Sequence, residues 1–177
     1  KEQQPDKQTI RVAEAQIGRQ YWETVARLME NHAPFSKRSR QPAADEFNSL
    51  INYGYGMLYA KVETAALTAG LDPMIGIMHR EGYNRPALVY DAIEPFRPWV
   101  DRLVVELALE KSILADHFEN RKNGMWLSKQ GKKMLIPRFN EMMQTRARFN
   151  GKMLKKDDHL HRLMQGLVKQ LMDNAKT

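Results

Sequence analysis

One histidine and two carboxylates lie close together in the middle of this sequence, and these residue types can bind a divalent cation. His79 precedes Asp91 and Glu94, which are spaced i,i+3 and would share one face of a helix. A further carboxylate, Glu14, falls in the apolar stripe of an earlier helix, where an unpaired charge is costly. We therefore expect Glu14 to have a functional or paired role, and the fold to bring it to the same place.

An imidazole with two or three carboxylates can hold a hard or borderline cation and leave positions for water and phosphate oxygens. Such an ion polarises a phosphodiester and lowers the pKa of an attacking hydroxyl. Mg²⁺ prefers oxygen ligands, and the single histidine suits Mn²⁺ equally, whereas Zn²⁺ is less favoured without a second one. A lone histidine after an apolar run is nevertheless more often structural than a ligand, so the spacing alone leaves both readings open.

Helical periodicity predicts the elements that must position these residues. Apolar residues at helical spacing indicate a first helix from Ile10 to Leu28, with its end at the sequence NHAP at 31–34. A second helix should begin at its N-cap residue Asp45 and stop at AGLDP, residues 69–73.

The helical pattern resumes after Pro86 and contains two further prolines. Pro95 cannot donate a hydrogen bond to the carbonyl of Asp91 and should kink the helix there, and Pro98 repeats the disturbance one turn later. We expect the helical pattern to extend from here towards Gly124.

The last part of the chain is expected to hold two more helices. Ser128 can cap the first of them, and the second, from Asp157 or Asp158, is strongly amphipathic. No repeat and no strand alternation of useful length is apparent. The sequence therefore predicts an all-α fold: a single multi-helix domain over 1–177, frayed at 1–8, with kinked central helices around a metal site.

One face of the second helix carries amide and phenol groups rather than charges or packing residues. Asn48, Asn52, Tyr55 and Tyr59 follow one another at steps of three or four residues. Two interpretations stay open: the wall of a polar pocket, or a buried hydrogen-bond ladder between helices. Gly54 and Gly56 on the same helix should let another helix pack closely.

The composition favours a polyanionic partner. The 177 residues include 28 Lys and Arg against 21 Asp and Glu, a net charge of +7. No apolar run approaches the roughly 20 residues needed to cross a bilayer, and no signal-peptide core is present. With no cysteine, the chain is expected to be cytoplasmic, without membrane partners. The cluster at 37–40, between two prolines, is either a solvated loop or a phosphate-contacting one.

Three runs of the sequence carry a family resemblance. FNSLINYGYGMLYAKVETAALTAGLDPMIGIMH, then RPALVYDAIEPFRPWVDRLV, then LSKQGKKML resemble the catalytic domain of the CRISPR-associated integrase of spacer acquisition, the Cas-one family. The likeness extends from about Glu14 to Leu135. It includes Asn48, a Leu-Asp-Pro turn, a G-x-x-H and a D-x-x-E ahead of an Arg-Pro, in family order.

The resemblance implies a set of site residues. Glu14, His79 and Glu94 are the implied ligands of Mg²⁺ or Mn²⁺, with Asp91 as a close supporter or alternate ligand and Tyr59 lining the site. The residues expected to contact DNA are Arg38, Arg40, Asn48, Arg97, Lys132 and Lys133.

The resemblance also implies an activity and partners. Family members insert new spacers by attack of a DNA 3′-hydroxyl on the repeat ends, cleave branched DNA, form homodimers and assemble with the small Cas-two subunit. They normally carry a β-rich N-terminal domain, whereas this sequence opens almost directly on the catalytic domain. We therefore expect it to be a fragment, a piece of a fusion or the ordered part of a longer chain. The missing domain makes much of the dimer contact in the family, so the resemblance supports the active site more strongly than it supports a dimer.

Two other functions compete with the metal-dependent integrase and endonuclease. The first is a non-catalytic helical DNA-binding or scaffold module, in which a degenerate acidic cluster only buttresses packing. The second is a small-molecule metallohydrolase, whose activity would be insensitive to salt, whereas DNA binding through Lys and Arg weakens steeply as salt rises.

Overall fold

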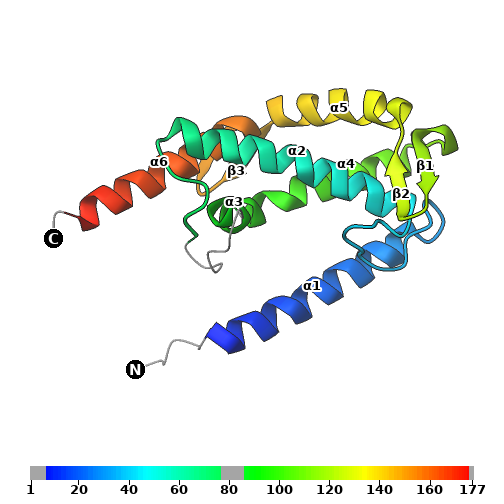
Figure 1. Cartoon of the computed structure of the whole chain (residues 1–177), viewed down its shortest axis with the longest axis horizontal. Helices are drawn as coiled ribbons and strands as arrows, with labels where there is room; N and C mark the ends of the chain where they lie inside the picture. The colour runs from blue at the N-terminus through cyan, green and yellow to red at the C-terminus, as the bar shows by residue number, and fades with distance from the viewer. Residues whose placement is uncertain (1–6, 77–85, 176–177) are drawn as a thin grey trace.

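The computed structural model describes residues 7–76 and 86–175, and over these residues it is mainly helical (Figure 1). Short 3₁₀ turns span Glu94–Phe96 and Ala115–His117. The helices are α1 (Lys7–Met29), α2 (Glu46–Thr68), α3 (Ala87–Ile93), α4 (Arg97–Leu109), α5 (Lys129–Gln144) and α6 (Lys156–Asn174). The strands are β1 (Phe118–Arg121), β2 (Gly124–Leu127), β3 (Arg146–Phe149) and β4 (Lys152–Lys155).

The predicted helix boundaries are largely confirmed, because local side chains determine them. Asp45 caps α2 by accepting a hydrogen bond from the backbone N–H of Asn48, and Gly70 follows the helix at a φ of +79°. Ser128 caps α5 by accepting from two backbone N–H groups of its first turn. The expected kink at Pro95 is the 3₁₀ turn between α3 and α4.

Two antiparallel hairpins, β1–β2 and β3–β4, correct the all-α prediction. α4 ends at Leu109 rather than extending towards Gly124. Each strand is four residues long, too short for alternation to stand out. The missed signal was the turn chemistry: Asn150 and Gly151 both have positive φ, at 47° and 72°, which is the two-residue hairpin turn that Asn-Gly favours.

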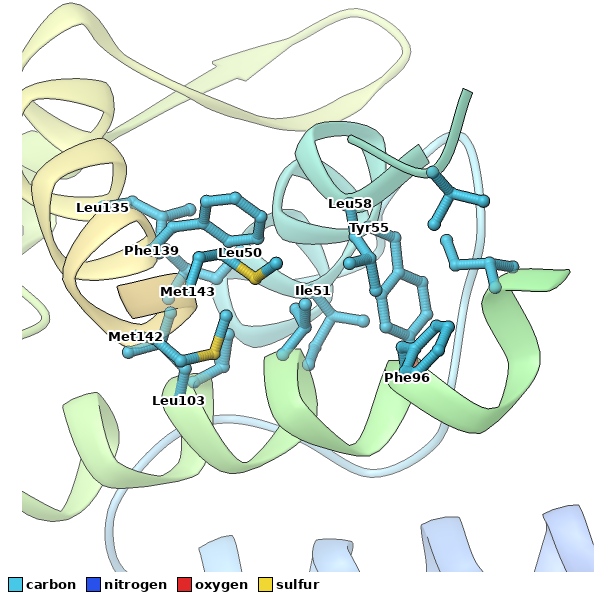
Figure 2. Packing of buried hydrophobic residues seen from close by; sticks show 14 of the residues in the cluster. Leu50, Ile51, Tyr55, Leu58, Phe96, Leu103, Leu135, Phe139, Met142 and Met143 are labelled. Carbon is cyan, nitrogen blue, oxygen red and sulfur yellow. The ribbon is translucent and has the colours of Figure 1, made fainter. Parts of the chain in front are cut away.

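The core lies where α2 crosses α4 and is covered by α5 and α6 (Figures 1 and 2). Ile51 and Leu58 of α2 meet Phe96 at the kink, and Phe139 and Met143 of α5 close the other side. All five side chains are at most 1% exposed. Burying each stabilises the fold by about 1.5–3 kcal/mol, so this cluster fixes the helices that carry the site.

The crossing of α2 and α4 depends on Gly54. A Cβ at this position would lie 2.5 Å from Cγ1 of Val100, whereas a Cβ at Gly56 would meet no atom within 4 Å. The expected close packing is therefore confirmed at Gly54 and wrong at Gly56, which faces the surface.

Alanine at these two glycines should have opposite effects on stability. We expect Gly54→Ala to lower the free energy of unfolding by about 1–3 kcal/mol, because the helices must separate. Gly56→Ala is the matched control and should raise it by up to about 1 kcal/mol through helix propensity alone. Urea unfolding followed by circular dichroism measures both, and equal effects would contradict the close crossing.

α1 does not bury the stripe that its sequence suggested. Val25 and Met29 at its C-terminal end are buried, but Ile17 is 66% exposed and Leu28 is 52% exposed. In Figure 1 the helix runs beside the body of the molecule and stands away from it towards the N-terminal end. Glu14 is therefore exposed, and the argument that burial would penalise its charge was wrong. Periodicity shows which face could be buried but not whether a partner covers it.

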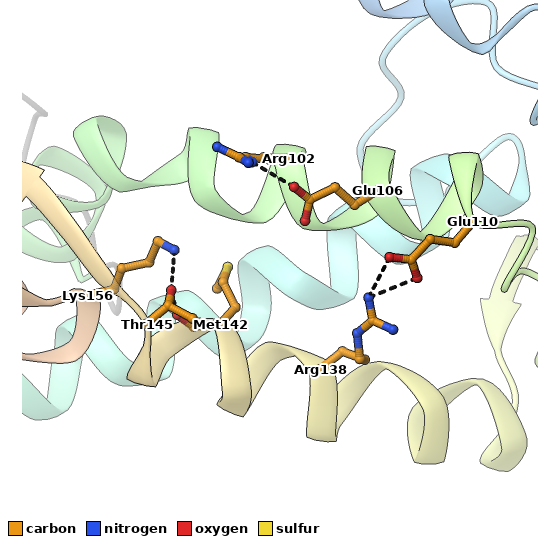
Figure 3. A network of polar contacts seen from close by, with 7 residues as sticks. All are labelled: Arg102, Glu106, Glu110, Arg138, Met142, Thr145 and Lys156. Carbon is orange, nitrogen blue, oxygen red and sulfur yellow. Dashed lines mark hydrogen bonds and ion pairs between the residues drawn. The ribbon is translucent and has the colours of Figure 1, made fainter.

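Polar contacts at the surface join α4, α5 and α6 (Figure 3). Arg138 of α5 forms an ion pair with Glu110 at 2.9 Å, and Arg102 pairs with Glu106 within α4 at 2.7 Å. Such exposed pairs are screened by water and contribute little to stability, so the core rather than this network positions the helices. Among the described residues, no helix offers a long enough apolar stretch to cross a bilayer.

Candidate functional site

A cavity of about 700 Å³ lies between α1 and the kink at the start of α4. Glu14 and Tyr21 line it from α1, and Glu94, Arg97 and Asp101 line it from the opposite side. The fold thus brings the carboxylates of Glu14 and Glu94 to one cavity, although 80 positions separate them in the chain. That they bind one metal ion stays a prediction.

Asp101 lies at the base of this cavity and is 4% exposed. The hydroxyl of Tyr55 donates a hydrogen bond to its Oδ1 at 2.6 Å, and the hydroxyl of Tyr21 donates to its Oδ2 at 3.0 Å. Burial raises the pKa of Asp101, although both hydrogen bonds and the nearby arginines oppose the shift. Burial and the Asp101 charge also raise the pKa of both tyrosines, so they remain protonated donors.

Two guanidinium groups lie against the ring of Tyr55. The Cζ atoms of Arg38 and Arg97 are 5.5 Å and 5.2 Å from the ring centroid, and Arg38 also lies 5.6 Å from the ring centroid of Trp22. Burial lowers the pKa of Arg38. Burial acts in the same direction on Arg97, but Tyr59 and Glu94 outweigh it and raise its pKa. Both side chains therefore supply fixed positive charge beside the cavity.

Arg97 links the cavity to the polar face of α2. Its Nη1 forms an ion pair with Glu94 at 2.9 Å, and its Nη2 donates to the hydroxyl of Tyr59 at 2.8 Å. Its Nε is buried and has no acceptor among the described residues. A buried donor of this kind usually has a partner, and none of the described residues supplies one.

Arg38 is held by the connector between α1 and α2. Its Nη1 donates to Oδ1 of Asn48 at 2.9 Å, and its Nη2 donates to Oδ1 of Asn52 at 2.6 Å. Asn48 is fully buried and its Nδ2 donates to the carbonyl of Lys37 and to the carboxylate of Asp45. The line of polar residues on α2 is therefore a hydrogen-bonded ladder, and its role is to hold two arginines in place.

The remaining predicted residues lie at the margins of this site or away from it. Asp91 is half-buried on α3, and Arg40 is exposed on the connector, with its carbonyl accepting from Nδ2 of Asn52 at 2.9 Å. Lys132 and Lys133 are exposed on α5 and are not among the described residues that line the cavity.

The structure leaves the third predicted metal ligand undescribed. His79 lies between the two described ranges, so its position relative to Glu14 and Glu94 stays a prediction. Within 7–76 and 86–175, no three His, Asp or Glu side chains form a group that could hold a metal ion. The two carboxylates on the cavity wall are nevertheless the oxygen donors that Mg²⁺ and Mn²⁺ prefer.

Sequence reasoning missed Asp101 and Tyr21 as members of this site. A charged residue in the middle of an otherwise buried helix was the available signal for Asp101.

Comparisons with known proteins agree on one family. The family model described as "CRISPR associated protein Cas1" matches residues 2–141. A CRISPR-associated endonuclease Cas1 of Thermus thermophilus is 36% identical over 135 residues, which are 76% of this chain and 42% of the relative. The chain thus spans about two fifths of the length of this relative.

Solved structures show the same fold. A casposase bound to integration product matches 91% of this chain and 46% of its own, with a TM-score of 0.82 and 24% identity. A chain of a Cas6-RT-Cas1–Cas2 complex superposes with a TM-score of 0.84 and 24% identity. The match covers 97% of the present chain and 19% of the chain in that complex.

Proposed function

Because this chain belongs to the Cas1 family, we propose that it is the catalytic domain of a divalent-metal-dependent DNA integrase and endonuclease of CRISPR adaptation. The observation that carries the proposal is one cavity that holds the Glu14 and Glu94 carboxylates beside Arg97, whose buried Nε lacks an acceptor among the described residues. Carboxylates for a cation and a guanidinium for a phosphate are the groups that phosphodiester chemistry requires.

Glu14 and Glu94, with His79 as the third predicted ligand and Asp91 as a supporter, would hold Mg²⁺ or Mn²⁺. A bound ion would stabilise the charge that develops on the attacked phosphodiester. The two carboxylates fit such an ion because they supply oxygen donors to one cavity, Glu14 from α1 and Glu94 from the 3₁₀ turn on the opposite side.

The other residues of the chain bind and orient the DNA. Arg97 would bind a phosphate oxygen through its guanidinium group, which Tyr59 fixes through the hydrogen bond at 2.8 Å. Arg38 and Arg40 would contact the backbone from the connector, and Asn48 supports them by holding the connector in place. Lys132 and Lys133 would bind a more distant part of the strand.

The reaction is a transesterification at phosphorus. A DNA 3′-hydroxyl attacks a phosphodiester, so a bond forms between that oxygen and phosphorus while the bond to the departing 3′-oxygen breaks. The attacking hydroxyl releases its proton to solvent, and the departing oxygen takes up a proton from solvent. One P–O bond forms for each one that breaks, so the number of phosphodiester bonds is unchanged. With water in place of the hydroxyl, the same geometry gives hydrolysis.

The proposed partners are DNA, a second copy of the chain and a Cas2 subunit. The surplus of positive charge supports DNA, and the name of the endonuclease relative agrees with it. The Cas2 partner is supported by a Cas6-RT-Cas1–Cas2 complex that contains a chain of this fold.

Transfer of a labelled DNA 3′-end into a repeat-containing plasmid tests this function. We expect joined products with Mn²⁺ or Mg²⁺ and none when EDTA removes the metal. DNA affinity measured in parallel should fall more than about tenfold between 50 and 200 mM salt, because bound counterions are released. Metal-independent products, or equal activity in a Glu14→Ala, His79→Ala, Glu94→Ala triple variant, would overturn the proposal.

A further inference from the structure

A second cavity, of about 420 Å³, lies beside a different face of α2, between that helix, the connector and the β1–β2 hairpin. Of the residues in the hydrogen-bonded ladder on α2, only Asn52 lines this second cavity. No residue lines both this cavity and the one that holds Glu14 and Glu94. Its walls are mainly apolar and include Pro42, Tyr53, Met57, Met125, Trp126 and Leu127. We call it the hairpin pocket.

The aromatic walls of the hairpin pocket are bordered by cations. Trp126 is 42% exposed, and the guanidinium carbon of Arg121, which also pairs with Glu119 at 2.7 Å, lies 5.5 Å from its ring centroid. Tyr53 is half-buried, and Nζ of Lys132 lies 5.6 Å from its ring centroid. An apolar protein segment would need no such charges, whereas aromatic rings next to Arg and Lys are the pattern that binds bases and phosphates of a single strand.

The pocket is preformed, because its two outer walls are joined. The backbone N–H of Met125 donates to the carbonyl of Ala43 at 3.0 Å. A Cβ at position 124 would lie 2.6 Å from that carbonyl oxygen, so only glycine allows the hairpin to approach the connector this closely. The hairpin and the connector therefore hold the aromatic walls in place before a ligand arrives.

The connector joins the hairpin pocket to the proposed active site. Pro42 lines the pocket, while Arg38, four residues earlier, lies against Tyr55 beside the first cavity. Asn52 binds both parts of this segment, since its Oδ1 accepts from Arg38 at 2.6 Å and its Nδ2 donates to the carbonyl of Arg40 at 2.9 Å. A strand that contacts Arg38 and Arg40 can therefore continue to the pocket along one rigid segment.

We propose that the hairpin pocket receives an unpaired nucleobase of the DNA strand, stacked on Tyr53 or Trp126, with Arg121 and Lys132 on the flanking phosphates. The inference rests on the proposed function in that it takes DNA as the ligand. It gives the hairpin a binding role that is independent of the carboxylates. It also gives Lys132 a specific partner, which its charge alone did not supply.

Binding of two labelled single strands tests the pocket: an oligothymidine, and a strand of equal length and charge made of abasic residues. Stacking of one base is worth about 1–3 kcal/mol, so the whole 177-residue chain should bind oligothymidine roughly 5- to 150-fold more tightly. A Tyr53→Ala, Trp126→Ala double variant should lose this ratio and keep its affinity for the abasic strand. Leu67→Ala, which removes an exposed apolar side chain near the other end of α2, is the matched control and should keep the ratio.

The outcomes separate this inference from the proposed function. Equal affinity of the wild-type chain for the two strands would overturn the base pocket and leave strand transfer intact. A ratio that persists in the double variant would overturn it as well. Base-dependent binding by a chain without strand transfer would support the pocket while the proposed function fails. The wild-type comparison needs no variant, so a folding defect in the double variant does not affect it.

Discussion

Replacing Glu94 by glutamine is expected to lower metal-dependent strand transfer by at least about 100-fold, and Glu14→Gln should do the same. The glutamine side chain has nearly the same shape but lacks the charge that a divalent cation requires. The two residues line one cavity from different helices, so neither can replace the other. Strand-transfer rates at saturating DNA measure the activity, and titration with Mn²⁺ followed by electron paramagnetic resonance measures metal binding directly.

The Mn²⁺ titration distinguishes a ligand from a positioning residue. Glu94 also forms the ion pair with Arg97, so Glu94→Gln could reduce activity by releasing that guanidinium. In that case Mn²⁺ affinity would stay within about twofold of wild type, and the assignment of Glu94 as a ligand would be wrong. Glu23→Gln is the matched control, because Glu23 is exposed on α1 and is not among the described residues that line the cavity.

Removing the carboxylate of Asp101 should have the largest effect on stability. Asp101→Ala leaves the hydroxyls of Tyr21 and Tyr55 without their acceptor and removes the negative charge near Arg38 and Arg97. Breaking a buried charged network of this kind costs about 3–5 kcal/mol. Urea unfolding should show this loss, whereas Arg102→Ala, at the neighbouring exposed position, should leave the unfolding transition nearly unchanged. A loss below about 1 kcal/mol in Asp101→Ala would contradict the network.

The pH dependence of stability gives a second test of Asp101. Its pKa is raised on folding by burial, so the unfolded chain releases the proton more readily than the folded one. Its contribution to stability is therefore complete below the ordinary aspartate pKa of about 3.9 and is lost as pH rises through the folded value. Relative to Asp101→Asn, which does not titrate, the wild-type free energy of unfolding should fall as pH increases over this window. A difference that does not change with pH would show that burial does not shift this group.

The features of the fold that could be predicted are those set by neighbouring residues. Caps at Asp45 and Ser128 and the kink at Pro95 depend on the local backbone, and the structure confirms all three. The burial of α1 depends on which other segment reaches it, and there the periodicity of Ile17 was misleading. The β3–β4 hairpin was predictable in principle, because Asn150-Gly151 is a strong turn signal.

The candidate site was only partly visible in the sequence. Glu94 and Arg97 stand in one short motif, and Glu14 was identified through the family resemblance and through a burial argument that the structure contradicts. Asp101 could not be assigned, because its two partners are 46 and 80 positions away in the chain and only the tertiary structure brings their hydroxyls to it. Local patterns therefore identify groups that can react, but not the buried residues that hold them.

The hydrogen bonds from Arg38 to Asn48 and Asn52 determine when this side chain loses its conformational freedom. An arginine side chain forfeits about 2 kcal/mol of rotamer entropy when it is immobilised. Asn48 and Asn52 already fix this guanidinium in the free protein, so the loss occurs during folding rather than on contact with a strand. Binding at Arg38 should therefore be entropically less unfavourable than binding at the exposed Arg40 two residues away, which must be ordered each time a ligand arrives.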